Sequence, residues 1–364
     1  MTTEANLTYL LLSRTYAMHL YTADLARAVL DAGGAAHLVT VAGYPAHLYD
    51  PRVQVHTVWP AGMGTMSPRP LLRGAIGRVV EAVRVLGPDV VHITGPQLLT
   101  PLVASRLGGL GVPIVHTLHD LDPHPGAVYG RLLHLWNRAV MSSADRVLVH
   151  ARRYLERLPQ DKGAYLPLLH LFLGHADLES LDRRSLAPIT APRALFFGRV
   201  AAYKGVDVLL RAWEMVAEPG WELVIAGLGD SAAEPDALLP AGLVRRNALI
   251  GDDEAVALFE GCVALVLPYT GATQSALVPA AYRFGRPVIV TDSGALPEYV
   301  VQGETGWIVP PNDPAALADA LLQALGDLER CQRMGMAGRA WYDVQRANER
   351  AGLLALYQEM ARGR

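Results

Sequence analysis

The sequence predicts an α/β protein made of two doubly wound domains, and three observations lead to this fold class. Short apolar runs alternate with helix-like segments, and continuous apolar strands separated by helices indicate parallel sheets covered on both faces. The chain has 364 residues, which is long enough for two domains of ordinary size. Residues 159–192 are rich in Pro, Leu and His and interrupt the alternation, so the domain boundary is expected there.

The first series of elements forms an expected N-terminal Rossmann-like domain, residues 1–170. Its strands are expected at 7–13, 36–42, 53–59, 89–95, 113–119 and 146–150. Its helix-like segments are expected at 19–32, 70–86, 97–109, 127–143 and 151–158. A linker is expected at 171–192.

The second series forms an expected C-terminal Rossmann-like domain, residues 193–342. Its strands are expected at 194–198, 221–227, 248–250, 262–268, 286–290 and 306–310, and its helices at 204–216, 253–260, 273–284, 313–326 and 328–342. No strand follows the amphipathic segment 343–364, which is therefore expected to pack back on the first domain. Ligands of doubly wound sheets bind beyond the carboxyl ends of the strands, so we expect the two domains to face each other across a ligand-binding cleft.

Composition excludes several classes of protein. Half of the residues are hydrophobic (51%) and 18% are charged, which is typical of a globular chain with a large core. The two cysteines, Cys262 and Cys331, provide no disulfide framework, and no run approaches the roughly 20 apolar residues that span a bilayer. The N-terminus has no basic start before its apolar run, so we expect a first strand and a cytoplasmic protein instead of a signal peptide.

Charge is distributed unevenly between the halves of the chain. Residues 1–170 hold 15 Lys and Arg against 11 Asp and Glu, whereas the remainder holds 17 against 24. A mildly basic first half could contact anionic lipid at the inner face of a membrane, and the arginine-containing segment 68–87 is the candidate for this peripheral contact. An ordinary surface helix is the alternative for that segment. No nucleic-acid partner is expected.

Two cations follow the first strand of the second half. In ALFFGRVAAYKGVDVLLRAW (194–213), the strand ends at Gly198, Arg199 comes next, and Lys204-Gly205 opens a helix. The chain contains only two lysines, and a compact ammonium on a flexible stem suits a phosphate. Together with the helix start, Arg199 and Lys204 would neutralise a diphosphate. The alternative is a solvated loop that carries two cations.

Two further segments of the second half are candidates. The strand in ELVIAGLGD (222–230) ends at Gly227 in a Gly-Leu-Gly turn, which marks either a tight turn or the close approach of a ligand. In GATQSALVPAAYRFGRPVIV (271–290), a helix start at Thr273, Gln274 and Ser275 would present backbone N–H groups to an anion.

Histidines supply the candidates of the first half. His119 and Asp120 end the strand in VHTLHD, where His119 could hydrogen-bond a hydroxyl or a developing charge, although a histidine in a strand is often only a core residue. His124 in the following loop, and Tyr16 and His19 in SRTYAMH (13–19), are weaker acceptor-side candidates. No zinc-binding spacing such as H-E-x-x-H occurs, so no metal is expected.

The blocks GRVAAYKGVDVLLRAW, IAGLGD and FGRPVIVTDSGALPEYVVQGETGWIVPPND resemble the C-terminal half of the retaining glycosyltransferases of family GT4, which have the GT-B fold. PDVVHITGP, VHTLHDLDPHPG and SADRVLVHA extend the resemblance more loosely over the first half. It implies a metal-independent transferase without a cofactor, whose partners are a nucleotide-diphosphate sugar and a glycan, lipid-linked or small-molecule acceptor.

The resemblance also implies roles for individual residues. Arg199 and Lys204 would hold the donor diphosphate, and the segment from Ala248 to Gly251, including Ile250, would contact the nucleobase. His119 would contact the transferred sugar near the reaction centre, and we assign His119 and Asp120 as the catalytic pair.

The sequence departs from the family pattern in two places. SRTYAMH replaces the usual Gly-Gly loop after the first strand, and two glutamates of the family fall on Ala272 and Ala280. These differences leave open a non-catalytic homologue or partner subunit that binds a sugar nucleotide. A dinucleotide oxidoreductase is disfavoured because no G-x-G-x-x-G motif follows the first strand.

Overall fold

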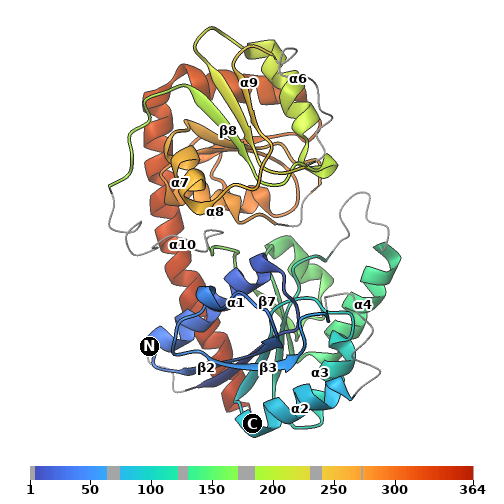
Figure 1. Ribbon diagram of the computed structural model, residues 1–364. Coiled ribbons are helices and arrows are strands. Elements are labelled where there is room, and N and C mark those ends of the chain that lie inside the picture. The colour runs from blue at the N-terminus through green and yellow to red at the C-terminus, as the bar shows by residue number, and fades with distance from the viewer. Residues whose placement is uncertain are drawn as a thin grey trace. The chain divides into compact units, whose positions relative to one another are not determined.

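The computed structural model describes residues 5–63, 74–121, 130–170, 185–229, 240–271 and 274–363. They form two compact units, each built around one parallel sheet (Figure 1). The first unit comprises Met1–Phe172 together with Ala347–Arg364, and the second comprises Leu173–Arg346.

The first unit contains a seven-stranded parallel sheet in the order β3-β2-β1-β4-β5-β6-β7. The strands are β1 (Asn6–Leu11), β2 (Ala35–Val41), β3 (Gln54–Trp59), β4 (Val90–Ile93), β5 (Ile114–Thr117), β6 (Arg146–Val149) and β7 (Gly163–Tyr165). Its other elements are α1 (Tyr16–Asp31), η1 (Ala46–Leu48), α2 (Ala75–Leu86), α3 (Thr100–Gly108), α4 (Gly130–Ser143) and η3 (Arg152–Arg157). The central strands are buried along their length, which is why they read as continuous apolar runs.

The second unit contains a six-stranded parallel sheet in the order β10-β9-β8-β11-β12-β13. The strands are β8 (Arg193–Phe197), β9 (Glu222–Ala226), β10 (Leu243–Arg246), β11 (Ala264–Leu267), β12 (Val288–Thr291) and β13 (Gly306–Val309). Its other elements are η4 (Ala202–Lys204), α6 (Val206–Val216), α7 (Asp252–Glu260), α8 (Leu277–Arg283), η6 (Leu296–Tyr299), α9 (Pro314–Gly326) and α10 (Leu328–Arg362), the last of which continues into the first unit. Counted from β8, this is the 3-2-1-4-5-6 order of a Rossmann domain.

The predicted doubly wound fold is confirmed in both units, with errors at the sheet edges. The expected strand at 248–250 is wrong, because those residues follow the edge strand β10, which is buried only at Leu243 and lacks an apolar run. The short edge strand β7 was not predicted, because it lies in the Pro- and Leu-rich stretch that interrupts the pattern. Residues 152–157 form a 3₁₀ helix where an α-helix was expected.

The last helix, α10, is continuous, whereas the sequence predicted two segments divided near residue 342 (Figure 1). No Gly or Pro stands at that division to end the first segment. From Ala347 onward the helix belongs to the first unit, where Tyr357 is fully buried. Its hydroxyl lies 2.6 Å from Nδ1 of His92 on β4. The C-terminal residues therefore complete the core of the first unit.

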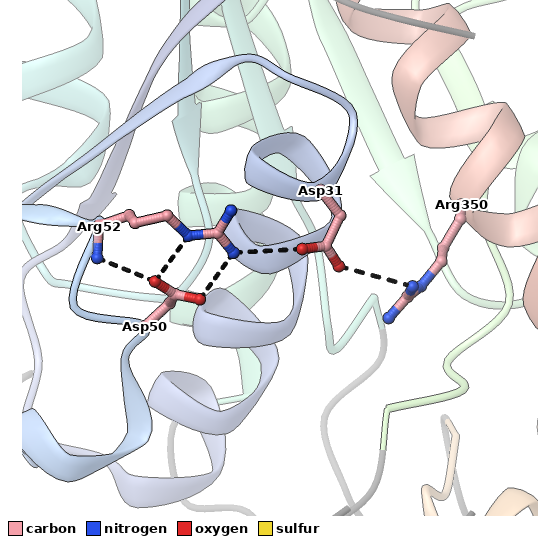
Figure 2. Close-up of polar contacts among 4 residues, drawn as sticks. All are labelled: Asp31, Asp50, Arg52 and Arg350. Carbon is pink, nitrogen blue, oxygen red and sulfur yellow. Dashed lines mark hydrogen bonds and ion pairs between the residues drawn. The ribbon is translucent and has the colours of Figure 1, made fainter. Parts of the chain in front are cut away.

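A chain of charged side chains joins three segments of the first unit (Figure 2). Arg52 donates to both carboxylate oxygens of Asp50, at 3.0 and 2.8 Å, and to Asp31 of α1 at 3.2 Å. The other oxygen of Asp31 lies 3.9 Å from a guanidinium nitrogen of Arg350 on α10. Hydrogen bonds from Arg52 lower the pKa of Asp50 to about 2. Exposed ion pairs of this kind contribute little to stability, so they orient α10 more than they stabilise it.

A buried arginine supports the second sheet. Arg286, in the FGRP turn before β12, is fully buried and donates to the carbonyl oxygens of Phe259 and Glu260 at the end of α7. It also donates to the carbonyl of Ala187 at 2.9 Å. The carbonyl oxygens of Phe259 and Glu260 have no partner within α7, so Arg286 caps the C-terminus of this helix. Its bond to Ala187 also holds the helix to the segment before β8.

Candidate functional site

Each sheet has a topological switch point, where the strand order reverses, and ligands of doubly wound sheets bind beyond the strands there. In the second unit the switch lies between β8 and β11, and in the first unit it lies between β1 and β4. The candidate cations follow β8, and the stretch with Gln274 and Ser275 follows β11. The structure thus brings these two predicted segments to the same end of the second sheet.

The glycines after β8 and β9 allow two loops to run side by side. Gly227 has a φ of 143°, and a Cβ there would overlap the carbonyl oxygen of Gly198. One step further, Gly229 pairs with Val200 in a parallel bridge, and a Cβ at Gly229 would overlap the carbonyl oxygen of Val200. Contact between the two backbones therefore explains the Gly-Leu-Gly motif without a ligand.

The loops after β8 and β11 are also joined closely. The backbone N–H of Thr270 donates to the carbonyl of Tyr203 at 2.8 Å, and the Thr270 hydroxyl donates to the same oxygen at 3.2 Å. Gly205, with a φ of 64°, lies against the backbone of Pro268, where a Cβ would overlap its carbonyl oxygen. This contact fixes the position of Lys204, which lies in the 3₁₀ turn η4 and not in the helix that was expected to begin there.

Lys204 is held at this junction by an aromatic side chain. Its Nζ lies 2.8 Å from the hydroxyl of Tyr269 and 4.5 Å from the centroid of the Tyr269 ring. Burial lowers the pKa of Lys204, an effect that nearby Arg199 reinforces. No carboxylate pairs with Lys204 in the part of the chain that the structure describes. An enclosed ammonium without an anionic partner is a site for an anion.

Arg199 lies on the same loop but in a different environment. Its side chain is exposed and has no ion pair with the described residues. A guanidinium remains charged and offers a fork of N–H donors, so Arg199 can approach a phosphate from the solvent side. The two predicted cations thus lie near each other, one enclosed and one exposed.

The predicted helix start at 273–275 is wrong. Helix α8 begins at Leu277 and is only seven residues long. Gln274 and Ser275 precede it, and Ser275 is buried with its hydroxyl accepting from the N–H of Leu277 at 3.3 Å. Thr273, together with Ala272, lies outside the described residues. The N–H groups of Gln274 and Ser275 therefore do not form the first turn of a helix.

Ile250 and Gly251 lie between β10 and α7. Gly251 precedes the first residue of α7, and its carbonyl accepts from Ala255 at 2.9 Å. The first turn of α7 carries the acidic residues Asp252, Asp253 and Glu254. Because the segment is an irregular loop, any contact with a nucleobase would come from this loop and not from the expected strand.

In the first unit, His119 follows β5 and is 7% exposed. Its Nε2 lies 2.8 Å from the carbonyl oxygen of Thr94, which follows β4. A carbonyl only accepts, so in the neutral ring Nε2 carries the proton and Nδ1 carries a lone pair. Nδ1 has no hydrogen-bond partner among the described residues. Nδ1 is buried, so the His119 ring keeps an acceptor that no described residue uses.

His119 belongs to an aromatic cluster that the sequence analysis did not identify. Its ring lies 5.0 Å from the Tyr21 ring and 5.2 Å from the His150 ring, and the His170 ring lies 5.5 Å from that of Tyr21. Burial lowers the pKa of both His119 and His150. His119 and His150 are thus held as neutral rings. The sequence could have indicated His150, because this residue directly follows β6 just as His119 closely follows β5.

The remaining candidates of the first unit differ in exposure and in how many of their polar atoms are already hydrogen-bonded. Asp120 is partly exposed, and its carbonyl accepts from the Asn137 side chain at 3.1 Å. Both nitrogens of fully buried His19 are used, by the Tyr49 hydroxyl at 2.6 Å and the Ser13 carbonyl at 2.9 Å, so a structural role explains this residue. Tyr16 is 40% exposed. His124 lies outside the described residues.

Three further features concern surface charge, membrane crossing and metal binding. The exposed arginine Arg84 of α2 pairs with Glu81 at 2.6 Å, so the described part of segment 68–87 presents both charge signs. No helix in the described part of the chain combines the length and the apolar character needed to cross a bilayer. Over the same residues, no group of three or more His, Cys, Asp or Glu side chains is arranged to hold a metal ion.

Comparisons with known proteins agree with the division into two units. Residues 17–169 match the family described as glycosyl transferase 4-like domain, and residues 191–327 match the family described as glycosyl transferases group 1.

Two curated proteins illustrate the similarity in sequence. D-inositol 3-phosphate glycosyltransferase of Streptomyces avermitilis is 27% identical over 264 residues, which cover 62% of this chain and 56% of that protein. GDP-mannose-dependent alpha-mannosyltransferase of Mycobacterium tuberculosis is 27% identical over 281 residues, which cover 72% of each. The chain therefore spans less than two thirds of the first relative.

A solved structure shows the same fold. Sucrose-phosphate synthase from Thermosynechococcus elongatus superposes with a TM-score of 0.73 at 19% identity, covering 99% of this chain and 100% of that one. This likeness confirms the predicted GT-B fold.

Proposed function

Because the chain belongs to the family of glycosyltransferases described by the group 1 and 4-like domains, we propose that it moves a sugar from a nucleotide-diphosphate sugar to a hydroxyl of an acceptor. The acceptor is a glycan, a lipid-linked sugar or a small molecule. The names of the relatives, which include an inositol phosphate glycosyltransferase and a mannosyltransferase, support this class of reaction.

One observation carries the proposal, namely the enclosed ammonium of Lys204 at the switch point of the second sheet. It has a phenol and an aromatic face around it but no carboxylate from the described residues. A diphosphate supplies the missing negative charge, and exposed Arg199 adds a second cation to the same loop. We therefore place the donor diphosphate on the second unit, with Gly198, Gly227 and the loop that contains Ile250 and Gly251 near it.

The chemistry requires stabilisation of a departing diphosphate. The bond between the anomeric carbon and the diphosphate oxygen breaks, and Lys204 and Arg199 stabilise the negative charge that develops on that oxygen. Because these two cations perform this role, the proposed reaction uses no metal ion. The acceptor oxygen bonds to the anomeric carbon on the face that the diphosphate leaves, and the acceptor proton passes to a phosphate oxygen. This course retains the anomeric configuration.

The first unit contributes recognition of the sugar. The lone pair on Nδ1 of His119 accepts a hydrogen bond from a sugar hydroxyl, and Thr94 fixes the tautomer that makes this possible. Asp120, the next residue, is the second candidate on this strand end. The resemblance places two family glutamates on Ala272 and Ala280, so the proposal assigns recognition of the sugar and ribose hydroxyls to neutral groups such as Gln274.

The test is a panel of UDP-, GDP- and other nucleotide sugars, scored by thermal shift and then by transfer. A ligand that binds only the folded chain raises the midpoint of thermal unfolding by mass action. We expect one donor class to stabilise the protein and to give a product with the donor's anomeric configuration by NMR, in the presence of EDTA. Tight binding without transfer or hydrolysis over a broad acceptor panel would instead identify a non-catalytic sugar-nucleotide binder.

A further inference from the structure

Tyr269 lies at the point where the loops after β8 and β11 meet. It is 2% exposed, and its hydroxyl and ring both contact the Lys204 ammonium. Its backbone carbonyl accepts from the hydroxyl of Thr291 at the end of β12, at 2.6 Å. The Tyr269 side chain thus projects from a fixed piece of backbone.

The hydrogen-bond directions around Tyr269 are determined by its neighbours. An ammonium only donates, so the Tyr269 oxygen accepts from Lys204 and the phenolic proton is free to point elsewhere. Burial raises the pKa of the phenol, and a hydrogen bond with Ser275 lowers it to a smaller extent. The Tyr269 oxygen is therefore kept as a neutral acceptor for Lys204.

This arrangement leaves two of the three hydrogen-bond donors of Lys204 without an acceptor among the described residues. An ammonium has three N–H donors, and only the one directed at Tyr269 has an acceptor among the described residues. A Cβ on Gly198 would lie 3.6 Å from Nζ, so the absence of a side chain at Gly198 leaves space beside the ammonium. The remaining donors can therefore reach a ligand without moving the lysine.

We propose that Tyr269 is a positioning residue that holds the Lys204 ammonium, by its hydroxyl and ring, in the place where the donor diphosphate binds. The proposal rests on the proposed donor site and adds a residue that neither the motif nor the charge pattern identified. A flexible lysine samples many rotamers, and fixing one of them in advance removes that entropy loss from ligand binding.

The first experiment needs no ligand. The chain has only two lysines, Lys162 and Lys204, so protein labelled with ¹³C at the lysine Cε gives two NMR signals, which Lys162→Arg assigns. In Tyr269→Phe the ammonium loses its acceptor, so the pKa of Lys204 should fall further while the Lys162 signal stays in place. Lys162 is a matched reference because its Nζ bonds the Ala144 carbonyl at 2.8 Å in the first unit. An unchanged Lys204 signal would overturn the proposal.

The second experiment measures ligand affinity. Tyr269→Phe should raise the Kd for inorganic pyrophosphate, and for whichever of UDP or GDP binds, by about tenfold, while the affinity of the matching nucleoside stays constant. Tyr282→Phe is the control, because Tyr282 is a buried tyrosine of the same unit whose hydroxyl bonds Tyr299 and Thr305. It should lower the unfolding temperature without changing either affinity. Equal weakening of nucleoside and pyrophosphate by Tyr269→Phe would show a merely structural role.

A double-mutant cycle separates positioning from general disturbance. If Tyr269 acts through Lys204, Tyr269→Phe should change the pyrophosphate Kd less than twofold in a Lys204→Met background. Additive effects would overturn the proposal. Failure of the wild-type protein to bind any diphosphate would refute the proposed function, whereas the ligand-free lysine signals would still decide whether Tyr269 fixes Lys204.

Discussion

The hydroxyl of Tyr357 on α10 lies 2.6 Å from Nδ1 of His92 on β4, and both side chains are fully buried. The other nitrogen of His92 is 2.7 Å from the hydroxyl of Thr117 on β5. A residue from the end of the chain thus satisfies a polar group in the middle of the first sheet. This relationship ties the stability of the first unit to its last helix.

We expect Tyr357→Phe to lower the free energy of unfolding by about 1–3 kcal/mol, because it leaves a buried histidine nitrogen without a partner. Urea unfolding followed by circular dichroism measures this loss. The control is Tyr16→Phe, since the Tyr16 hydroxyl faces His47 at 3.4 Å on the surface. That change should stay within about 0.5 kcal/mol. Equal effects of the two substitutions would contradict the role assigned to Tyr357.

Gly227→Ala should destabilise the second unit, because a Cβ at this position would overlap the carbonyl of Gly198 and the φ of 143° is accessible mainly to glycine. The conformational penalty alone is about 1–3 kcal/mol. Gly326→Ala is the control, since Gly326 lies in α9 with open space around its Cβ position. Thermal unfolding should show a lower midpoint for the first variant and an unchanged or higher one for the second.

The buried histidines make the fold sensitive to acid. Burial lowers the pKa of His19 to about 4 and that of His116 to about 3, below the ordinary value of 6.5. Between these folded values and 6.5 the unfolded chain binds protons that the folded chain does not, so stability falls as the pH drops below about 6.5. Above that pH these two groups contribute no slope.

His116→Leu tests this linkage, because neither nitrogen of His116 has a hydrogen-bond partner among the described residues. Between pH 6.5 and 4.5, we expect the unfolding free energy of the variant to depend less steeply on pH than that of the wild type. The difference should correspond to about one proton bound on unfolding. The substitution should change the free energy of unfolding at pH 7.5 by less than it changes the difference in that free energy between pH 6.5 and 4.5. A slope equal to that of the wild type would show that His116 titrates normally.

Lys204→Ala should abolish the thermal shift produced by the best nucleotide ligand, because it removes the enclosed ammonium. Arg199→Ala should reduce that shift only in part, since an exposed guanidinium contributes less than an enclosed charge. The control is Arg211→Ala, a surface cation of α6 that pairs with Asp207. A shift retained in Lys204→Ala would refute the diphosphate assignment.

Residue patterns predicted the two sheets, because their central strands are continuous apolar runs. They missed β7 and misplaced β10, since short edge strands are partly exposed and carry no such run. They also placed the start of α8 too early, because Thr273 and Ser275 have the chemistry of helix caps whereas Ser275 is buried before the helix begins.

The sequence could indicate candidate residues that lie in a recognisable motif, such as Lys204 and His119. Tyr269 was not, because its contact with Lys204 joins positions 65 residues apart, and periodicity does not report on such pairs. The Gly-Leu-Gly motif shows the converse, since Gly227 and Gly229 are required by the neighbouring backbone whether or not a ligand approaches.

The first unit is discontinuous in sequence, since it consists of the beginning of the chain and its last residues. A ribosome synthesises the chain from the N-terminus, so Tyr357 joins the core of the first unit only after Leu173–Arg346 has been made. The second unit, Leu173–Arg346, is synthesised completely before then. A chain ending before Ala347 therefore lacks part of its first folding unit, and separate expression of residues 1–172 would expose the apolar surface that Tyr357 covers.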